Sequence, residues 1–124
     1  HETCNFVYMK EIASGEAYNN RSDLGNGPND GPKYKGAGVL QLTGKFNYSR
    51  LADGINDPKV MDGVDYVSST YPFVSAQIWI KENDLLNVCL NQGFDACCKR
   101  INGGWNGYED RKAKYAICQR EMHL

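Results

Sequence analysis

Two glutamates near the start of the chain have the side chains that a paired acid and base require. Glu2 and Glu11 lie nine residues apart. On one continuous helix that spacing puts them on opposite sides, because each residue turns the helix by about 100°. If the chain turns back through an extended segment, the carboxyls face each other across a groove. Inverting glycoside hydrolysis needs roughly 6.5 to 9.5 Å between two carboxyls, which leaves room for a water. The alternative is two solvated surface charges, the usual setting of Glu.

The size and charge of the chain limit its class. A chain of 124 residues fits one domain, 1–124, and is long enough to bury a core. Fourteen Lys and Arg face fifteen Asp and Glu, and the net charge of -1 gives no long-range attraction to phosphates or anionic lipid. No apolar stretch is long enough for a membrane span. We expect a soluble monomer with no nucleic-acid or membrane partner.

Cysteine usage favours disulfides over metal. The cysteines are Cys4, Cys89, Cys97, Cys98 and Cys118. Their spacing fits no usual zinc site, so we expect no metal and no cofactor. Four of them lie near the C-terminus, which predicts a disulfide within residues 89–118 and a secreted protein. The alternative is buried free thiols in a cytosolic protein.

The adjacent pair Cys97 and Cys98 restricts the disulfide pairing. On a helix their side chains diverge by about 100°, so each has a different neighbour. Cys89 and Cys118 are the candidate partners, and Cys4 is either unpaired or ties down the start of the chain. A free N-terminal His1 could also bind copper, but this needs a second histidine and only His123 is present.

The first half of the chain must position the glutamates. Residues 1–12 alternate in an extended pattern, and residues 13–38 carry Gly, Pro and Asn at the density of a long loop. A loop of that length in a compact domain is usually functional, and we expect residues 24–38 to line a groove. "GVLQLT" reads as a short strand. Thr43 is the expected N-cap of a helix over "GKFNYSRLADGI".

The second half reads as helix. Asp57 with Pro58 marks a short helix start, and Thr70 with Pro72 is expected to open a buried central helix through residue 80. Further helices are predicted to end at Gly93, to run from Asp95 to the glycines 103–104, and to run from Tyr108 to the C-terminal end. The class is mainly α with a small extended region.

Four sequence landmarks follow one another along the chain. The first is "HET", with the Glu of "KEI" nine residues after its own Glu. The second is "AYNNRSDLGN", and the third and fourth are "KYKGAGVLQLTGKFNY" and "INGGWNGYEDR". Together they cover nearly the whole chain. In this order they resemble the family 19 glycoside hydrolases, which include plant-type chitinases and bacterial and phage lysins, and the second is similar to the loop of the bacterial and lysin branch.

The resemblance implies a lysozyme-like, α+β fold in which two helical lobes flank a substrate groove. It implies an inverting glycosidase that cleaves β-1,4 bonds between N-acetylated aminosugars, with chitin the first substrate and peptidoglycan a close second. Family members carry a helix before the first landmark, and this chain begins at His1. The expectation is therefore a catalytic domain without that helix. The rival hypothesis is a non-catalytic chitin- or cell-wall-binding defence protein with the same fold.

The resemblance also assigns residue roles. Glu2 becomes the general acid, Glu11 the general base, and Thr43 the hydroxyl that holds the attacking water. The substrate-binding residues that it implies, or that offer a face to a sugar, are Tyr34, Gln41, Asn47, Asn102, Trp105 and Arg111. Arg111 is expected beside the base carboxylate, where its positive charge would keep that group ionised. Tyr34 and Trp105 are expected to stack on sugars, with a core position the alternative for each.

Overall fold

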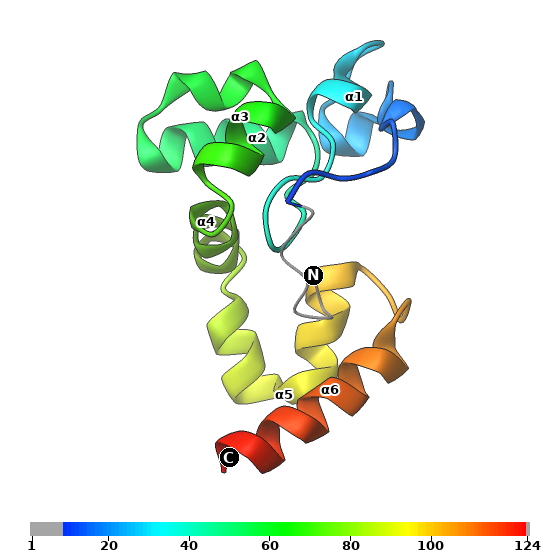
Figure 1. Cartoon of the computed structure of the whole chain (residues 1–124), viewed down its shortest axis with the longest axis vertical. Helices are drawn as coiled ribbons and strands as arrows, with labels where there is room; N and C mark the ends of the chain where they lie inside the picture. Colours follow the sequence, from blue (N-terminus) through cyan, green and yellow to red (C-terminus); the bar gives the residue numbers. More distant parts are fainter. Residues whose placement is uncertain (1–8, 124) are drawn as a thin grey trace. The chain divides into compact units, whose positions relative to one another are not determined.

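The structure is a computed structural model that describes residues 9–123, and most of these residues are helical (Figure 1). Residues 9–82 form one compact unit and residues 83–123 a second. In order, the elements are η1 (Glu16–Tyr18), η2 (Ser22–Leu24), α1 (Asp30–Lys33), α2 (Lys45–Ile55), η3 (Pro58–Asp62), α3 (Val64–Thr70), α4 (Val74–Glu82), α5 (Leu85–Asn102) and α6 (Tyr108–Met122). The mainly α class is confirmed. That one catalytic domain spans residues 1–124 stays a prediction.

The core of the first unit forms around one face of α2. Tyr48, Leu51 and Ala52 are buried there at helical spacing, and α2 packs on η3 and α4. Val60 of η3 and Val67 of α3 are fully buried in the same cluster. Burial of a Val or Leu side chain contributes roughly 1.5 to 3 kcal/mol. This cluster is the rigid support for the loop that precedes α2.

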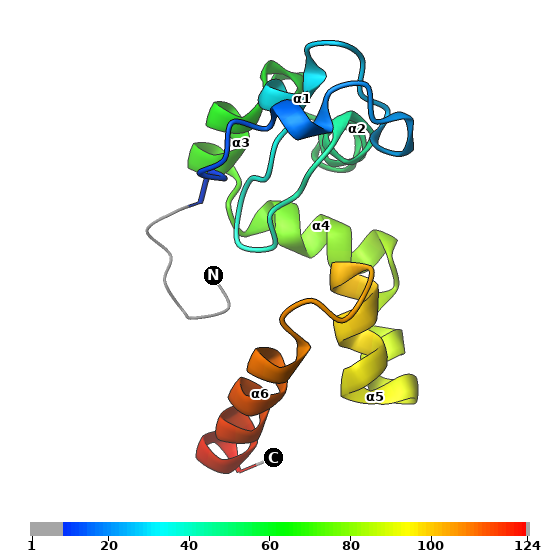
Figure 2. The ribbon, with the colours of Figure 1, turned by 90° about the vertical axis from the view of Figure 1, so that its right-hand side faces the viewer.

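That loop is held by single bridges, and the strand expected at "GVLQLT" is wrong. Ala37 pairs with both Lys10 and Leu42 as isolated bridges. Between them Gly38 (φ 80°) and Gln41 (φ 55°) turn the backbone tightly, which prevents a ladder. The tip of the loop reaches the α3–α4 connection, where the Val39 N–H donates to the Pro72 carbonyl at 2.9 Å (Figure 2). Residues 13–38 are also less irregular than expected, since they contain η1, η2 and α1.

The start of α2 differs from the prediction. Thr43 is not its N-cap: the helix begins at Lys45 after Gly44, and the Thr43 hydroxyl bonds elsewhere. The Lys45 N–H is satisfied instead by the side chain of Asn26, which accepts it at 2.9 Å. Asn26 comes from 19 residues upstream, so this cap is a tertiary contact that no local pattern reveals.

Thr70 does not open the next long helix either. It ends α3, a helix that the sequence analysis missed, and α4 begins at Val74. The β-branched residues of α3 have low helix propensity, which hides it. The expectation of a buried central helix is also wrong in degree: α4 buries Ser75 and Ala76 but leaves Phe73, just before it, 56% exposed.

The helix start at Asp57 and Pro58 is confirmed. Asp57 caps η3 by accepting the Lys59 N–H, and Pro58 lies in the first turn. The other Asp57 oxygen accepts the hydroxyls of Tyr66 at 2.6 Å and Tyr71 at 2.7 Å. These two hydrogen bonds lower the pKa of the Asp57 carboxyl. Asp57 therefore joins η3, α3 and the α3–α4 connection.

In the second unit, α5 breaks where the sequence predicts. Gly93 has φ 85° and ψ −178°, so the helix kinks there, and α5 ends at Gly103 as expected. A disulfide joins Cys89 before the kink to Cys97 after it, with the Cα atoms 5.2 Å apart. The prediction of a disulfide within residues 89–118 is confirmed, with Cys89 as the partner of Cys97. Cys98 is buried and Cys118 is exposed.

Helix α6 begins at Tyr108 as predicted, but none of its described residues is buried. Its ties to α5 are aromatic and polar: Tyr115 stacks on Phe94 at 4.2 Å, and the Tyr108 hydroxyl donates to Asp95 at 2.6 Å. That hydrogen bond raises the pKa of Tyr108 to about 12. Of the helices in residues 9–123, none is long and apolar enough to cross a membrane.

Candidate active site

Glu11 is placed by backbone pairing with the loop before α2. Its N–H donates to the Gly36 carbonyl at 2.8 Å, and the Gly38 N–H donates to the Met9 carbonyl at 2.6 Å. The Lys10–Ala37 bridge lies between these two bonds. Residues 9–11 therefore run antiparallel to residues 36–38. This pairing fixes the Glu11 backbone against a loop that is itself anchored to the core.

Two donors hold the Glu11 carboxylate, one on each oxygen. The Tyr18 hydroxyl donates to Oε1 at 3.0 Å, and the Gly36 N–H donates to Oε2 at 2.7 Å. Burial, followed by the hydrogen bond to Glu11, raises the pKa of Tyr18, so this phenol stays a donor at neutral pH. A half-buried carboxylate with two fixed donors has one orientation and keeps lone pairs for a further partner.

Gly36 must lack a side chain for this arrangement. A Cβ built there would lie 2.7 Å from the Gln41 Oε1 and 3.0 Å from the Glu11 Oε2. The Gln41 amide and the Glu11 carboxylate thus converge on one glycine. The Gln41 side chain also donates to the Gly38 carbonyl at 2.9 Å, which fixes the amide.

Gln41, Thr43 and Asn47 form a chain of hydrogen bonds. The Thr43 hydroxyl donates to the Gln41 carbonyl at 2.8 Å, and the Asn47 amide donates to the Thr43 carbonyl at 2.8 Å. Because its proton is committed, the Thr43 oxygen is left to accept a hydrogen bond. Four of the residues predicted for the site, including Glu11, therefore belong to one connected segment of the first unit.

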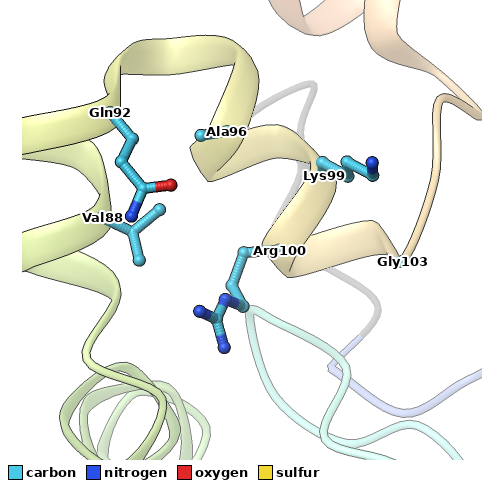
Figure 3. Close-up of a pocket in the computed structure, with 6 residues that line it drawn as sticks. All are labelled: Val88, Gln92, Ala96, Lys99, Arg100 and Gly103. Carbon is cyan, nitrogen blue, oxygen red and sulfur yellow. The ribbon is translucent and has the colours of Figure 1, made fainter.

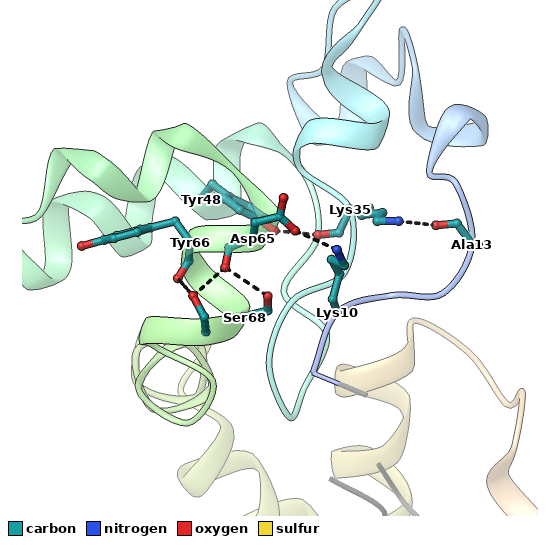
Figure 4. A network of polar contacts seen from close by, with 8 residues as sticks. Lys10, Ala13, Lys35, Tyr48, Asp65, Tyr66 and Ser68 are labelled. Carbon is teal, nitrogen blue, oxygen red and sulfur yellow. Dashed lines mark hydrogen bonds and ion pairs between the residues drawn. The ribbon is translucent and has the colours of Figure 1, made fainter. Parts of the chain in front are cut away.

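Contacts from the core support this segment (Figure 4). The Tyr48 hydroxyl, on a fully buried side chain, donates to the Lys35 carbonyl at 2.6 Å, next to Gly36. The Lys35 ammonium donates to the Ala13 carbonyl at 2.7 Å, just after Glu11. Lys10 pairs with Asp65 of α3 at 2.8 Å, an exposed ion pair of small value. The carboxylate is thus held through Gly36 and Lys35 by a core tyrosine.

Tyr34 does not line a groove, so its stacking role is wrong and the alternative core position holds. Its side chain is 3% exposed and meets the Tyr48 ring edge-on at 5.1 Å. Its hydroxyl donates to the Met61 carbonyl at 3.2 Å. A buried ring has no face to offer a sugar.

The remaining predicted residues lie in the second unit, in and beside the turn between α5 and α6. The Asn102 amide and the Arg111 guanidinium both donate to the Asn106 carbonyl, at 2.9 Å and 2.7 Å. Trp105 is 55% exposed and rests edge-on against Tyr108. Its ring is available for stacking. That Arg111 lies beside Glu11 stays a prediction.

Glu2, the predicted acid, lies outside the described residues, as do His1 and Cys4. Sequence reasoning missed Tyr18, Gly36 and Asn26. The Asn26 side chain is buried and bridges the Tyr18 carbonyl to the start of α2, at 2.9 Å on each side. No local signal marks Tyr18, but its place in "AYNNRSDLGN" puts it inside the second landmark. Within residues 9–123 no group of three His, Cys, Asp or Glu gathers as a metal site would require.

Comparisons with known proteins agree with the landmarks. The chain is 31% identical over 104 residues to "Endochitinase At2g43610" of Arabidopsis thaliana, which covers 84% of the chain and 36% of that protein. It is 31% identical over 109 residues to a "Glycosyl hydrolase family 19 domain-containing protein" of Haemophilus influenzae, which covers 85% of the chain and 51% of that protein.

The chain is homologous to family 19 glycoside hydrolases. A further relative, "Endochitinase EP3" of Arabidopsis thaliana, is 33% identical over 113 residues, 83% of the chain and 38% of that protein. The chain thus spans between about a third and a half of these relatives. No family model and no solved structure matches it. The family 19 assignment is supported by these relatives and is consistent with the mainly helical fold.

Proposed function

We propose that this chain carries the catalytic segment of a glycoside hydrolase that cleaves β-1,4 bonds between N-acetylated aminosugars with inversion. The observation that carries the proposal is the Glu11 carboxylate, which the Tyr18 hydroxyl and the Gly36 N–H hold in one orientation. The chain that carries it is similar to a family 19 protein. Chitin is the first substrate and peptidoglycan the second, since the relatives include proteins named endochitinase. With its disulfide, the protein works in an oxidising, extracellular setting, as a monomer.

Glu11 acts as the general base. It takes a proton from a water that attacks the anomeric carbon, while Glu2 gives a proton to the leaving glycosidic oxygen, so the bond to that oxygen breaks as the bond to water forms. The Thr43 oxygen accepts a hydrogen bond from the same water, because its own proton is committed to Gln41. Tyr18 and Gly36 keep the Glu11 lone pair in one direction.

The amides of Gln41, Asn47 and Asn102 suit the N-acetyl and hydroxyl groups of the sugar, since each amide has donor and acceptor atoms. Trp105 offers an exposed ring to a sugar face. Arg111 supplies a fixed positive charge near the turn that follows α5. No metal or cofactor takes part in this mechanism.

Product analysis on two substrates tests the proposal. Chitin hexamer and purified peptidoglycan are each incubated with the protein, and products are identified by mass and their anomeric form by NMR. We expect shorter oligomers that are released with inverted configuration. Glu11→Gln should abolish turnover, because the amide is not a base, whereas Glu16→Gln, an exposed glutamate of η1, should leave it intact. Equal activity of the two variants would remove Glu11 from its role. Binding of chitin oligomers by wild type without any cleavage would favour the non-catalytic alternative.

A further inference from the structure

A pocket in the second unit lies between the two halves of α5 (Figure 3). Its volume is about 440 Å³, and it is lined by Val88, Gln92, Ala96, Lys99, Arg100 and Gly103. The kink at Gly93 creates it, because a straight helix would not place residue 88 opposite residue 100. The lining residues within residues 9–123 all belong to one stretch of chain in the second unit.

The disulfide fixes the width of this pocket. Cys89 follows the lining residue Val88, and Cys97 follows the lining residue Ala96. Their bond therefore joins the two walls directly, with the Cα atoms 5.2 Å apart. A pocket whose walls are covalently tied presents its side chains at a nearly constant separation, as a binding site requires.

Among the described lining residues, the polar side chains are basic or neutral: Gln92, Lys99 and Arg100. In Figure 3 the Gln92 amide and the Arg100 guanidinium project from opposite halves of α5 into the space between them. Within residues 9–123 no carboxylate forms an ion pair with Arg100. Val88 and Ala96 provide an apolar wall beside these groups. The pocket thus combines an available guanidinium, an amide and a small apolar surface.

Lys99 links the pocket to an aromatic surface. Its ammonium lies 6.0 Å from the centre of the Trp105 ring, and Trp105 is exposed. An exposed indole is a usual platform for a sugar ring, and a cation beside it favours a sugar that carries negative charge. The pocket and this platform are adjacent because residues 99 and 100 are consecutive on α5.

We propose that this pocket binds the carboxylate of an acidic N-acetylated glycan, one with a short aliphatic acid or peptide attached to the sugar. A guanidinium matches a carboxylate with two parallel hydrogen bonds, the Gln92 amide adds a donor, and Val88 with Ala96 contacts the aliphatic part. This inference rests on the proposed glycan hydrolysis and deepens it. Chitin has no carboxylate, so the pocket would add binding for peptide-bearing peptidoglycan and none for chitin.

Binding of a glycan fragment too short to be cleaved tests the pocket separately from catalysis. Muramyl dipeptide, N,N′-diacetylchitobiose and inorganic phosphate are each titrated into the full chain by NMR, with the amides of residues 85–103 observed. We expect muramyl dipeptide to bind most tightly. Arg100→Gln should weaken it roughly tenfold, as loss of a charge-assisted hydrogen bond predicts. Arg100→Lys keeps the positive charge but not the two parallel N–H donors of the guanidinium, so its affinity for muramyl dipeptide should lie between those of wild type and Arg100→Gln.

Arg120→Gln is the matched control, since Arg120 pairs with Glu121 at 3.4 Å and lines no part of the pocket. Equal affinities of the Arg100 and Arg120 variants would overturn the proposal, and so would phosphate binding as tight as that of muramyl dipeptide. If binding depends on Arg100 but no glycan is ever cleaved, the pocket stands and the proposed hydrolysis falls. If glycans are cleaved but Arg100→Gln binds muramyl dipeptide as tightly as wild type does, the proposed hydrolysis stands and the pocket proposal falls.

Discussion

At the scale of single residues, the Tyr18 hydroxyl is the group whose loss most directly tests how Glu11 is held. Tyr18→Phe keeps the ring and removes only the donor to the carboxylate. We expect kcat to fall by roughly ten- to a hundredfold with KM nearly unchanged, because a hydrogen bond to a charged group is worth roughly 1.5 to 3 kcal/mol and orients the base. Steady-state kinetics on chitin hexamer measure both constants. Tyr115→Phe on α6, also partly exposed, is the control. A rise in KM alone would mean that Tyr18 contacts the sugar instead.

Tyr34 offers a contrasting residue-scale prediction. Its ring is buried and packs on Tyr48, so Tyr34→Ala should lower the free energy of unfolding by about 3 to 5 kcal/mol through the cavity it leaves. Chemical denaturation measures this loss. Trp105→Ala, at an exposed ring, should change stability far less and sugar binding more. If Tyr34→Ala unfolds at the wild-type denaturant concentration, Tyr34 is not part of the core.

The difference between these residues shows which site features a sequence reveals. Glu11, Gln41, Thr43 and Asn47 were predicted because they lie inside motifs whose order could be compared with a family. Tyr18 and Gly36 were missed as partners of Glu11, since they meet it from 7 and 25 residues away through a fold that no periodicity specifies. Because both are aromatic, the sequence predicts that Tyr34 and Trp105 stack on sugars. In the structure Tyr34 is buried and Trp105 is exposed.

At the scale of elements, predictions succeeded where the signal was local. Helix starts were predicted correctly at Asp57 with Pro58 and at Tyr108, and a helix end at Gly103. At each of these positions the residue type itself signals the helix boundary. They failed where a distant residue decides the boundary. Asn26 satisfies the first N–H of α2 in place of Thr43, and α3 forms from β-branched residues because Val64 and Val67 are buried against the core.

The junction of η3 with α3 gives an element-scale prediction on pH. Hydrogen bonds from Tyr66 and Tyr71 lower the pKa of Asp57 in the folded chain. A carboxyl with a lowered folded pKa stabilises the fold fully above its unfolded pKa, and this contribution is lost as pH falls through the folded value. The melting temperature should therefore fall below about pH 4 more steeply in wild type than in Asp57→Asn. Asp53→Asn, an exposed residue of α2, should follow wild type. Parallel curves for wild type and Asp57→Asn would show that Asp57 contributes nothing to acid stability.

At the scale of the whole molecule, the two units are stabilised by different means. The cluster of buried apolar residues from Tyr34 to Val67 belongs entirely to the first unit. The second unit buries Leu85, Val88 and Cys98 on α5 and no described residue of α6. A small core of this kind usually needs a covalent link, and the Cys89–Cys97 disulfide supplies one. The segment with the Glu11 carboxylate thus rests on the better packed unit.

Reduction of the disulfide should therefore loosen the second unit selectively. A loop closed by residues 89 and 97 stabilises by about 2 to 3 kcal/mol in the chain-entropy model, a large fraction of what a small core provides. Hydrogen exchange followed by mass spectrometry, with and without a reductant, measures protection in each unit. We expect the amides of residues 85–102 to exchange faster on reduction while those of residues 48–67 keep their protection. The double variant Cys89→Ser, Cys97→Ser should resemble the reduced protein without reductant, and Cys118→Ser, at an exposed thiol, should resemble wild type. Equal loss of protection in both units would show that they unfold together, and no change in either would show that the disulfide adds no stability.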